Sequence, residues 1–147
     1  MRIAVCALLL LSSCTAVPAP MPAPGPAPAG PEPSTGARAG WTATLSTLAH
    51  GVSGRATIVD EDTFRLDEFF YDGGGIIVYA YLGATDSNAA FASGLETGPQ
   101  LVGPPFNGGS LVIDLPPGQT LDGYNAVSIW CVAFGVSFGS GTFTDPG

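Results

Sequence analysis

Apolar and polar side chains alternate with a period of two in several short stretches after residue 50, which is the pattern of half-buried β-strands. Residues 63–66 alternate in this way, whereas residues 76–82 are apolar or aromatic throughout. A strand that is apolar on both faces is usually central in its sheet and covered on both sides. Further strands are expected in residues 52–58, 69–71, 111–115, 127–131 and 132–138.

Turn sequences separate these stretches, and helical periodicity is nearly absent. Residues 72–75 and 116–118 are rich in glycine or proline, and residues 84–96 form a weak helix candidate. Many short strands with closely spaced turns predict an all-β fold, an antiparallel β-sandwich that forms a single domain over residues 41–147. The expected core residues are Val78, Tyr79, Ile129, Val132 and Phe134.

The apolar face changes parity near the end of the chain. Apolar positions are odd from Val127 to Cys131 and even from Val132 to Phe138. A period of two cannot change parity without an extra residue or a break, so we expect a β-bulge or a strand corner near Trp130. Such a change would aim the Cys131 side chain away from the main core. The alternative is a strand that is buried on both faces.

The first 40 residues have a different character. A positive start precedes nine apolar residues, which is too short for a membrane-spanning helix but fits a signal peptide. The sequence Leu11-Ser12-Ser13-Cys14 resembles the lipobox of bacterial lipoproteins. This resemblance implies a signal peptide at residues 1–13, a lipid on Cys14, and a location in the bacterial cell envelope, facing the periplasm or the exterior. The alternative is an ordinary secretory signal cut elsewhere, for instance after Ala16.

Residues 14–40 are expected to be a Pro/Ala-rich tether. Such a sequence buries little apolar area and favours extended polyproline II geometry. The whole chain carries 4 Lys+Arg against 12 Asp+Glu, for a formal net charge of −8, and it has no lysine. This composition excludes a nucleic-acid binder, because phosphate affinity comes from clustered cations, and it disfavours attraction to an anionic membrane surface. Membrane contact is therefore expected through the lipid anchor alone.

Three cysteines occur, and the expected processing leaves one free thiol. Cys6 lies in the signal peptide and Cys14 would be acylated, so Cys131 has no partner for a disulfide within the domain. No Cys-x-x-Cys pair, haem-attachment motif or zinc quartet is present. Cys131 is then either a small structural residue of the core or a thiol with a chemical function.

His50 is the single histidine, and a dense group of acids lies between residues 60 and 72. His50 could ligate a haem or metal or lower the pKa of a thiol, or it could bond a backbone carbonyl beside the glycine turn that follows. The acids have oxygen ligands suited to Ca²⁺, but their spacing does not match an EF-hand loop, and solvated turns are the favoured interpretation. We predict no metal site.

Several blocks, taken together, resemble a known family. They are residues 50–54, 69–73, 78–83, 115–117, 124–131 and 134–139. Their order and spacing resemble the DM-thirteen domain, the electron transfer domain of bacterial lipoproteins and animal Skeletor-type proteins. The resemblance implies a β-rich extracellular domain that acts in electron transfer through a cysteine, which is Cys131 here. One departure is that Ile76-Ile77 stand where the family often has Pro-Asp.

Two functions follow from this sequence. The first is a membrane-tethered redox domain that uses Cys131 with an unidentified redox partner protein, either alone or with a bound prosthetic group. Haem is a candidate for that group, with Cys131 and more weakly His50 as its ligands. The second is a ligand-binding or adhesion module with a structural cysteine, in which exposed aromatic side chains stack on sugar rings. The candidates for that role are Trp41, Tyr79, Tyr81 and Tyr124.

Overall fold

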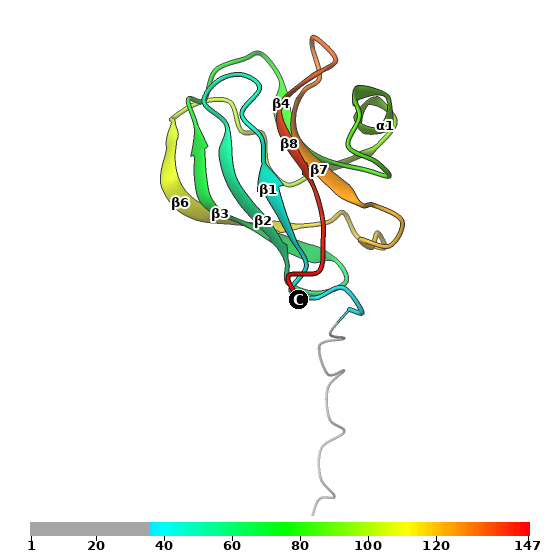
Figure 1. The fold of residues 1–147 in the computed structure, drawn as a ribbon. Helices are drawn as coiled ribbons and strands as arrows, with labels where there is room; N and C mark the ends of the chain where they lie inside the picture. Colours follow the sequence, from blue (N-terminus) through cyan, green and yellow to red (C-terminus); the bar gives the residue numbers. More distant parts are fainter. Residues whose placement is uncertain (1–35) are drawn as a thin grey trace, which may run out of the picture. The chain divides into compact units, whose positions relative to one another are not determined.

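The computed structural model describes residues 36–147. The expected signal peptide, the lipidated Cys14 and most of the tether lie outside these residues. Within residues 36–147, eight strands form two antiparallel four-stranded sheets, which confirms the all-β sandwich (Figure 1). The first sheet has the order β1-β2-β3-β6 (Thr42–Leu45, Ser53–Ile58, Thr63–Tyr71, Phe106–Asp114). The second has the order β5-β4-β7-β8 (Leu95–Thr97, Val78–Gly83, Ala126–Cys131, Val136–Thr142).

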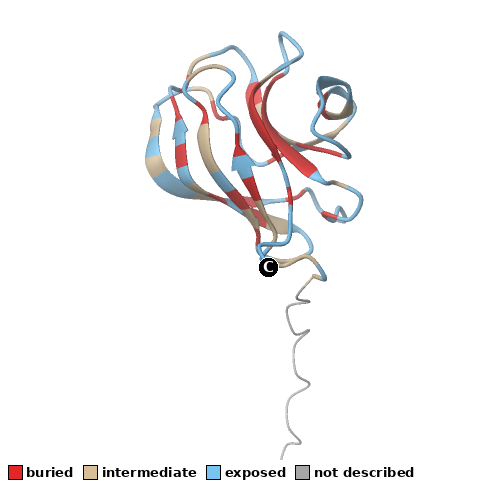
Figure 2. Cartoon of the chain, in the orientation of Figure 1, coloured by how far each residue is buried: buried red, intermediate tan, exposed pale blue. Residues whose placement is uncertain are grey.

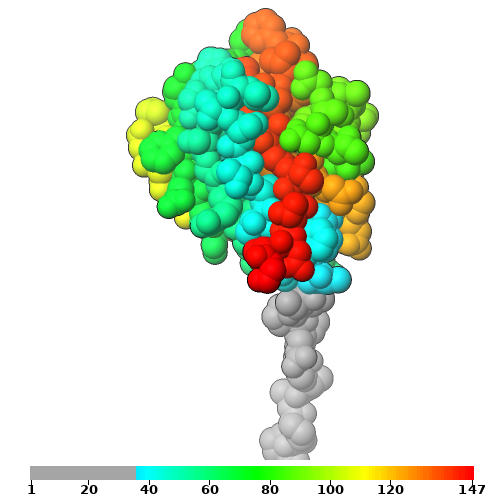
Figure 3. All heavy atoms as spheres, in the orientation of Figure 1, coloured from blue at the N-terminus to red at the C-terminus, as the bar shows by residue number. Residues whose placement is uncertain are grey.

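The inner faces of the two sheets enclose the main hydrophobic core (Figure 2). Along β3, Phe64 and Leu66 are fully buried while Arg65 between them is exposed, as the alternation predicted. At one side of the sandwich β1 lies beside the C-terminal segment, with Ser46 N–H donating to the Ser140 carbonyl at 2.8 Å (Figure 3). The sheets are thus joined along this seam as well as through the core.

The central strand was predicted correctly, although it begins later than expected. β4 lies between β5 and β7, and its inward residues Val78, Ala80 and Leu82 are fully buried. Ile76 and Ile77 are exposed and precede the strand. They belong to the loop that follows the glycine turn.

The expected parity change has two structural causes. The β7–β8 register shifts between Ile129 and Trp130, which is the expected irregularity, and residues 132–135 form the turn of a hairpin. β7 is also buried on both faces, because Trp130 packs against Phe91 in a second cluster behind the sheet. Cys131 belongs to the main core, so the prediction that it aims away from that core was wrong.

The predicted core list is partly confirmed. Val78 and Ile129 are fully buried and Tyr79 is half-buried. Val132 and Phe134 are 39 % and 66 % exposed, so their assignment to the core was wrong. Both side chains lie in the hairpin turn, where the alternation of apolar residues does not reflect a sheet face.

The weak helix candidate contains one short helix, α1 (Asn88–Ala92), capped by the Ser87 hydroxyl, which accepts from the Ala90 N–H. Its Phe91 ring lies 6.0 Å from the Trp130 ring and covers the outer face of β7. None of the helices in the described part of the chain has the length and hydropathy needed to cross a membrane.

Candidate functional site

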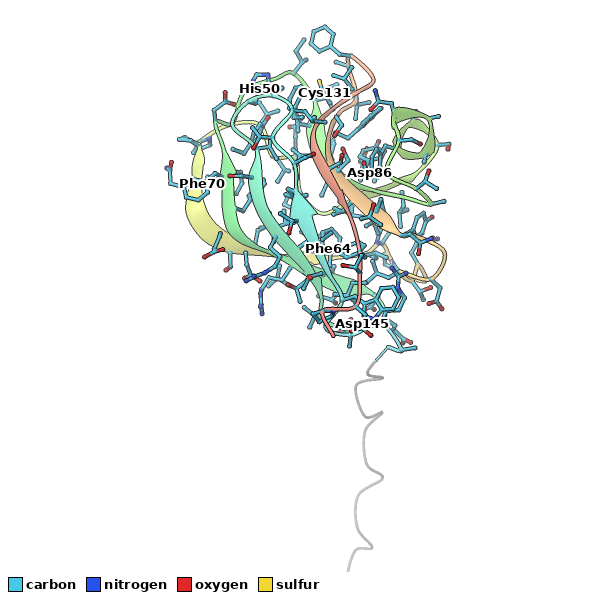
Figure 4. All side chains as sticks on the ribbon, in the orientation of Figure 1. His50, Phe64, Phe70, Asp86, Cys131 and Asp145 are labelled. Atoms are coloured by element: carbon cyan, nitrogen blue, oxygen red, sulfur yellow. The ribbon has the colours of Figure 1, made fainter. Side chains whose placement is uncertain are left out.

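Cys131 is the last residue of β7 and has no solvent exposure. It pairs with Val78 of β4 on one side and with Val136 of β8 on the other. Figure 4 places it at the same end of the sandwich as His50, while Asp145 lies at the opposite end. The described chain also begins at that opposite end, as Figure 1 shows.

Tyr71 ends β3 and belongs to the same core cluster as Cys131. Burial raises the pKa of Tyr71 to about 12, and the neighbouring Asp72 carboxylate and Cys131 thiol add to the rise. The Tyr71 hydroxyl donates a hydrogen bond to the Gly74 carbonyl. The phenol therefore keeps its proton at neutral pH and is held at the end of β3, in the same core cluster as Cys131.

Aromatic rings surround Tyr71 and extend from the core to the surface. The Tyr71 ring centre is 6.4 Å from those of both Phe106 and Phe138, and the Phe138 ring is 4.2 Å from the His50 ring. Phe69 continues the group inward, 5.0 Å from Phe106. Phe138, which is 5 % exposed, lies between buried Tyr71 and half-exposed His50.

The His50 ring meets a carboxylate, whereas the sequence suggested a backbone carbonyl or a bound ligand as its partner. His50 Nδ1 is 3.1 Å and 3.0 Å from the two carboxylate oxygens of Asp72. The Asp72 N–H donates back to the His50 carbonyl at 3.2 Å. The loop before β2 and the loop after β3 are therefore tied together at the rim of the site.

The Gly73-Gly74-Gly75 turn leaves room for these contacts. A Cβ on Gly74 would come within 2.8 Å of His50 Nδ1, and one on Gly75 would come within 2.8 Å of a Val78 methyl group. The Gly74 N–H also donates to Asp72 Oδ1 at 2.7 Å. The glycine run thus lets the imidazole, the carboxylate and the β4 strand approach one another.

These contacts set the ionisation of Asp72. The Gly74 N–H and then His50 lower the pKa of Asp72 below 3.8. A carboxyl whose pKa is lower in the folded state stabilises that state above its unfolded pKa, and this contribution is lost as the pH falls through the folded pKa. The hydrogen bond from the Gly74 N–H to Asp72 should therefore be intact above about pH 4 and weaken only under more acidic conditions.

We expect His50→Ala to raise the pKa of Asp72 and yet leave it below 3.8, because the Gly74 N–H is the larger cause. An NMR titration of the Asp72 carboxyl carbon measures this change. Leu48→Ala is the matched control, since Leu48 is exposed in the same loop and is not among the groups that shift the pKa of Asp72. An unchanged pKa in His50→Ala would show that the ion pair does not form in solution.

The acids between residues 60 and 72 do not gather around one point. Asp67 accepts from Arg65 Nε at 2.7 Å, Asp72 binds His50, and Asp60 caps its own turn by accepting from the Asp62 N–H at 3.1 Å. No group of three or more His, Cys, Asp or Glu side chains that could hold a metal occurs within residues 36–147. The acids act as turn and surface residues.

The surroundings of Cys131 bear on the expected prosthetic group. Cys131 and Val78 have no exposure and Tyr71 has 1 %, so side chains fill the space around the sulfur. A planar group as large as haem would have to displace them before it could reach Cys131. In this conformation the residues present do not fit such a group.

The four aromatic residues proposed for sugar stacking are half-buried, and two of them are engaged with other side chains. Trp41 lies under the Arg38 guanidinium, 4.9 Å from its ring centre, and the Tyr81 hydroxyl donates to Glu96 at 2.8 Å. The sequence argument singled out Cys131 and His50 but missed Tyr71 and Asp72 as their neighbours. Both lie in the block at residues 69–73 that carried the family resemblance, and this was the available signal.

The fold and the site place this domain among antiparallel β-sandwiches with an enclosed thiol. The family model of Electron transfer DM13 matches residues 44–143, so the chain belongs to this family. Protein Skeletor of Drosophila melanogaster is 33 % identical over 99 residues, both in isoforms B/C and in isoforms D/E. The alignments cover 65 % of this chain but only 13 % and 7 % of those relatives. No solved structure matches.

Proposed function

We propose that this chain is a membrane-tethered, extracytoplasmic electron-transfer domain whose redox-active residue is Cys131. Membership of the electron-transfer family supports the general role. The observation that carries the specific proposal is that Cys131 shares the main core with Tyr71, from which the rings of Phe138 and His50 lead to the surface. These rings provide close steps between the core that holds the sulfur and a docked partner.

The proposed step is a one-electron oxidation. The Cys131 thiol gives one electron to a strongly oxidising one-electron acceptor on a partner protein, such as a ferryl haem, and its proton passes to water when the packing around the sulfur opens. The sulfur becomes a thiyl radical and the acceptor gains the electron. A one-electron donor and a proton from water then restore the thiol. Tyr71 stays neutral throughout, because its pKa of about 12 keeps the phenol protonated.

Voltammetry of the full chain tests this assignment, in a background where Cys6 and Cys14 are replaced by serine so that Cys131 is the single thiol. We expect a one-electron wave that disappears in both Cys131→Ser and Cys131→Ala. Ile129→Val is the matched control, because Ile129 lies on the same strand and is equally enclosed, and it should keep the wave. Circular dichroism checks that each variant is folded.

A wave that survives in folded Cys131 variants would overturn the role of this cysteine. The absence of a wave in the parent chain would overturn the redox proposal itself. In that case the ligand-binding module with a structural cysteine takes its place.

The second part of the proposal is the anchor. A lipid on Cys14 would hold the domain to the membrane, and the tether after it could extend on the order of 80 Å at about 3.1 Å per residue. The described chain begins at the end of the sandwich opposite His50 and Cys131 (Figures 1 and 4). The anchor would therefore leave the redox end free to meet its partner.

Cys14→Ala tests the anchor by partitioning of the expressed chain between detergent and water. We expect the parent chain in the detergent phase and Cys14→Ala in the aqueous phase. Thr15→Ala, one residue further along, is the matched control and should partition like the parent. Identical mass and partitioning of Cys14→Ala and the parent would overturn the anchor and leave the redox assignment standing.

A further inference from the structure

The outer face of the first sheet contains a hollow of about 590 Å³. This volume lies within the range of about 300–1,000 Å³ that is usual for small-molecule sites. The hollow is lined by Thr44, Ser53, Gly54, Arg55, Glu68, Phe70, Asn107 and Gly108. None of these residues belongs to the group around Cys131, so the hollow is a separate feature of the fold.

Backbone irregularities in two strands shape this hollow. The β2–β3 register shifts between Ser53 and Arg55, and the β3–β6 register shifts between Leu66 and Phe70. Bulges bend a strand and re-aim its side chains, and they are frequent beside functional sites. The two bulges lie against each other, since a Cβ on Gly54 would be 3.0 Å from the Glu68 carbonyl oxygen.

Glu68 itself has a positive φ of 50°, which is unusual for a residue that is neither glycine nor asparagine. Strained backbone of this kind persists where the surrounding structure enforces it, and it is common at ligand sites. Here it places a carboxylate on the rim of the hollow.

The polar side chains of the hollow make few interactions within the domain. Arg55 and Glu68 make no hydrogen bond or salt bridge with other described side chains, although the charge of Arg55 helps to lower the pKa of Asp67, which pairs with Arg65. The hydroxyls of Ser53 and Thr44 likewise have no hydrogen-bond partner within residues 36–147. The hollow therefore offers a cationic donor, an anionic acceptor and two hydroxyls to a ligand.

An aromatic ring stands among these groups. Phe70 is 46 % exposed and is labelled at the outer side of the first sheet in Figure 4. Its ring lies over Gly108, where a Cβ would be 2.8 Å from Phe70 Cζ. The absent side chain at Gly108 thus lets the ring pack against the β6 backbone and stay in place with about half of its surface free.

We propose that this hollow binds a short neutral oligosaccharide. The free surface of Phe70 can stack on the C–H face of a sugar ring, and the surrounding donors and acceptors suit hydroxyl groups, which both donate and accept. Arg55 and Glu68 together contribute no net charge, which favours a neutral ligand over a strongly anionic one.

The test is an NMR titration of the full chain with three soluble probes: maltohexaose, xylohexaose and the hexamer of N-acetylglucosamine. We expect at least one probe to shift the backbone amides of Arg55, Glu68, Phe70 and Asn107 in a saturable way. Phe70→Ala should weaken that binding about tenfold, as expected for the loss of an aromatic contact worth roughly 1.4 kcal/mol. Arg55→Ala should weaken it as well.

Val112→Ala is the matched control, because Val112 is an exposed apolar residue of β6 that lies outside the hollow, and it should leave binding unchanged. Cys131→Ser should also bind normally, which keeps this site distinct from the proposed redox role. The absence of saturable shifts with all three probes would overturn the proposal. Binding that is unaffected by Phe70→Ala, or saturation of the same amides by a short peptide but by no sugar, would overturn it equally.

Discussion

The Phe64→Ala variant should lose about 3–5 kcal/mol of unfolding free energy, the usual cost of removing a fully buried phenylalanine ring. Phe64 has no solvent exposure and lies in the main core of β3, between Ile58 of β2 and Ile113 of β6. Because the surrounding strands are hydrogen-bonded to one another, the cavity can collapse only in part. Urea unfolding followed by circular dichroism measures the change.

Phe134→Ala provides the matched comparison for this variant. The same ring at position 134 is 66 % exposed in the hairpin turn, so its removal should change the unfolding free energy by less than about 0.5 kcal/mol. If Phe64→Ala does not fold, Phe64→Leu tests the same site with a smaller loss of volume. Equal costs at the two positions would contradict the arrangement of the core.

Gly73→Ala should cost about 2–5 kcal/mol, the sum of a positive-φ penalty and an overpacking penalty. Gly73 has a φ of 76°, and an added Cβ would overlap the Gly103 carbonyl oxygen. The Gly103 N–H also donates a hydrogen bond to the Gly73 carbonyl at 3.1 Å. The glycine turn and the Gly103 loop therefore cannot move independently of each other. The variant should also shift the NMR signals of His50 and Asp72, because the same turn holds them.

Gly118→Ala separates these two penalties. Gly118 has a similar φ of 81°, but an added Cβ would meet nothing within 4 Å. We expect a cost of about 1–2 kcal/mol there, from the backbone conformation alone. A Gly73→Ala variant no less stable than Gly118→Ala would show that the turn and the Gly103 loop are not in close contact.

Local patterns predicted the strands well because the pattern of a strand depends on residues that are adjacent in the sequence. The apolar run at 76–82 identified a central strand, and the parity change near Trp130 identified the irregularity between β7 and β8. The same reasoning failed for Val132 and Phe134 because apolar residues in a tight hairpin alternate just as they do in a strand. Whether such residues face a core depends on where the chain turns.

The candidate sites were harder to predict because they depend on contacts between distant parts of the chain. His50 and Asp72 are 22 residues apart, and no local pattern pairs them. The hollow depends on a bulge at Glu68, where the sequence has no glycine and the single turn-favouring neighbour Asp67 does not predict a break in the strand. Cys131 was identified early because it is the single cysteine in its domain, a property that sequence alone displays.

Cys131 is completely enclosed, so the packing of the core limits which reactions its sulfur can undergo. Alkylation, disulfide exchange and peroxide attack all require a reagent to touch the sulfur, so each must wait for the packing to open. Electrons can tunnel through packed side chains, so a redox partner need not touch the sulfur, and only the proton of the thiol needs a path to water. In oxidising surroundings, this sulfur would be shielded from covalent damage that accumulates on exposed thiols while it stays in electronic contact with the rim. The rate at which external oxidants slowly modify the Cys131 thiol would then report how often this end of the sandwich opens.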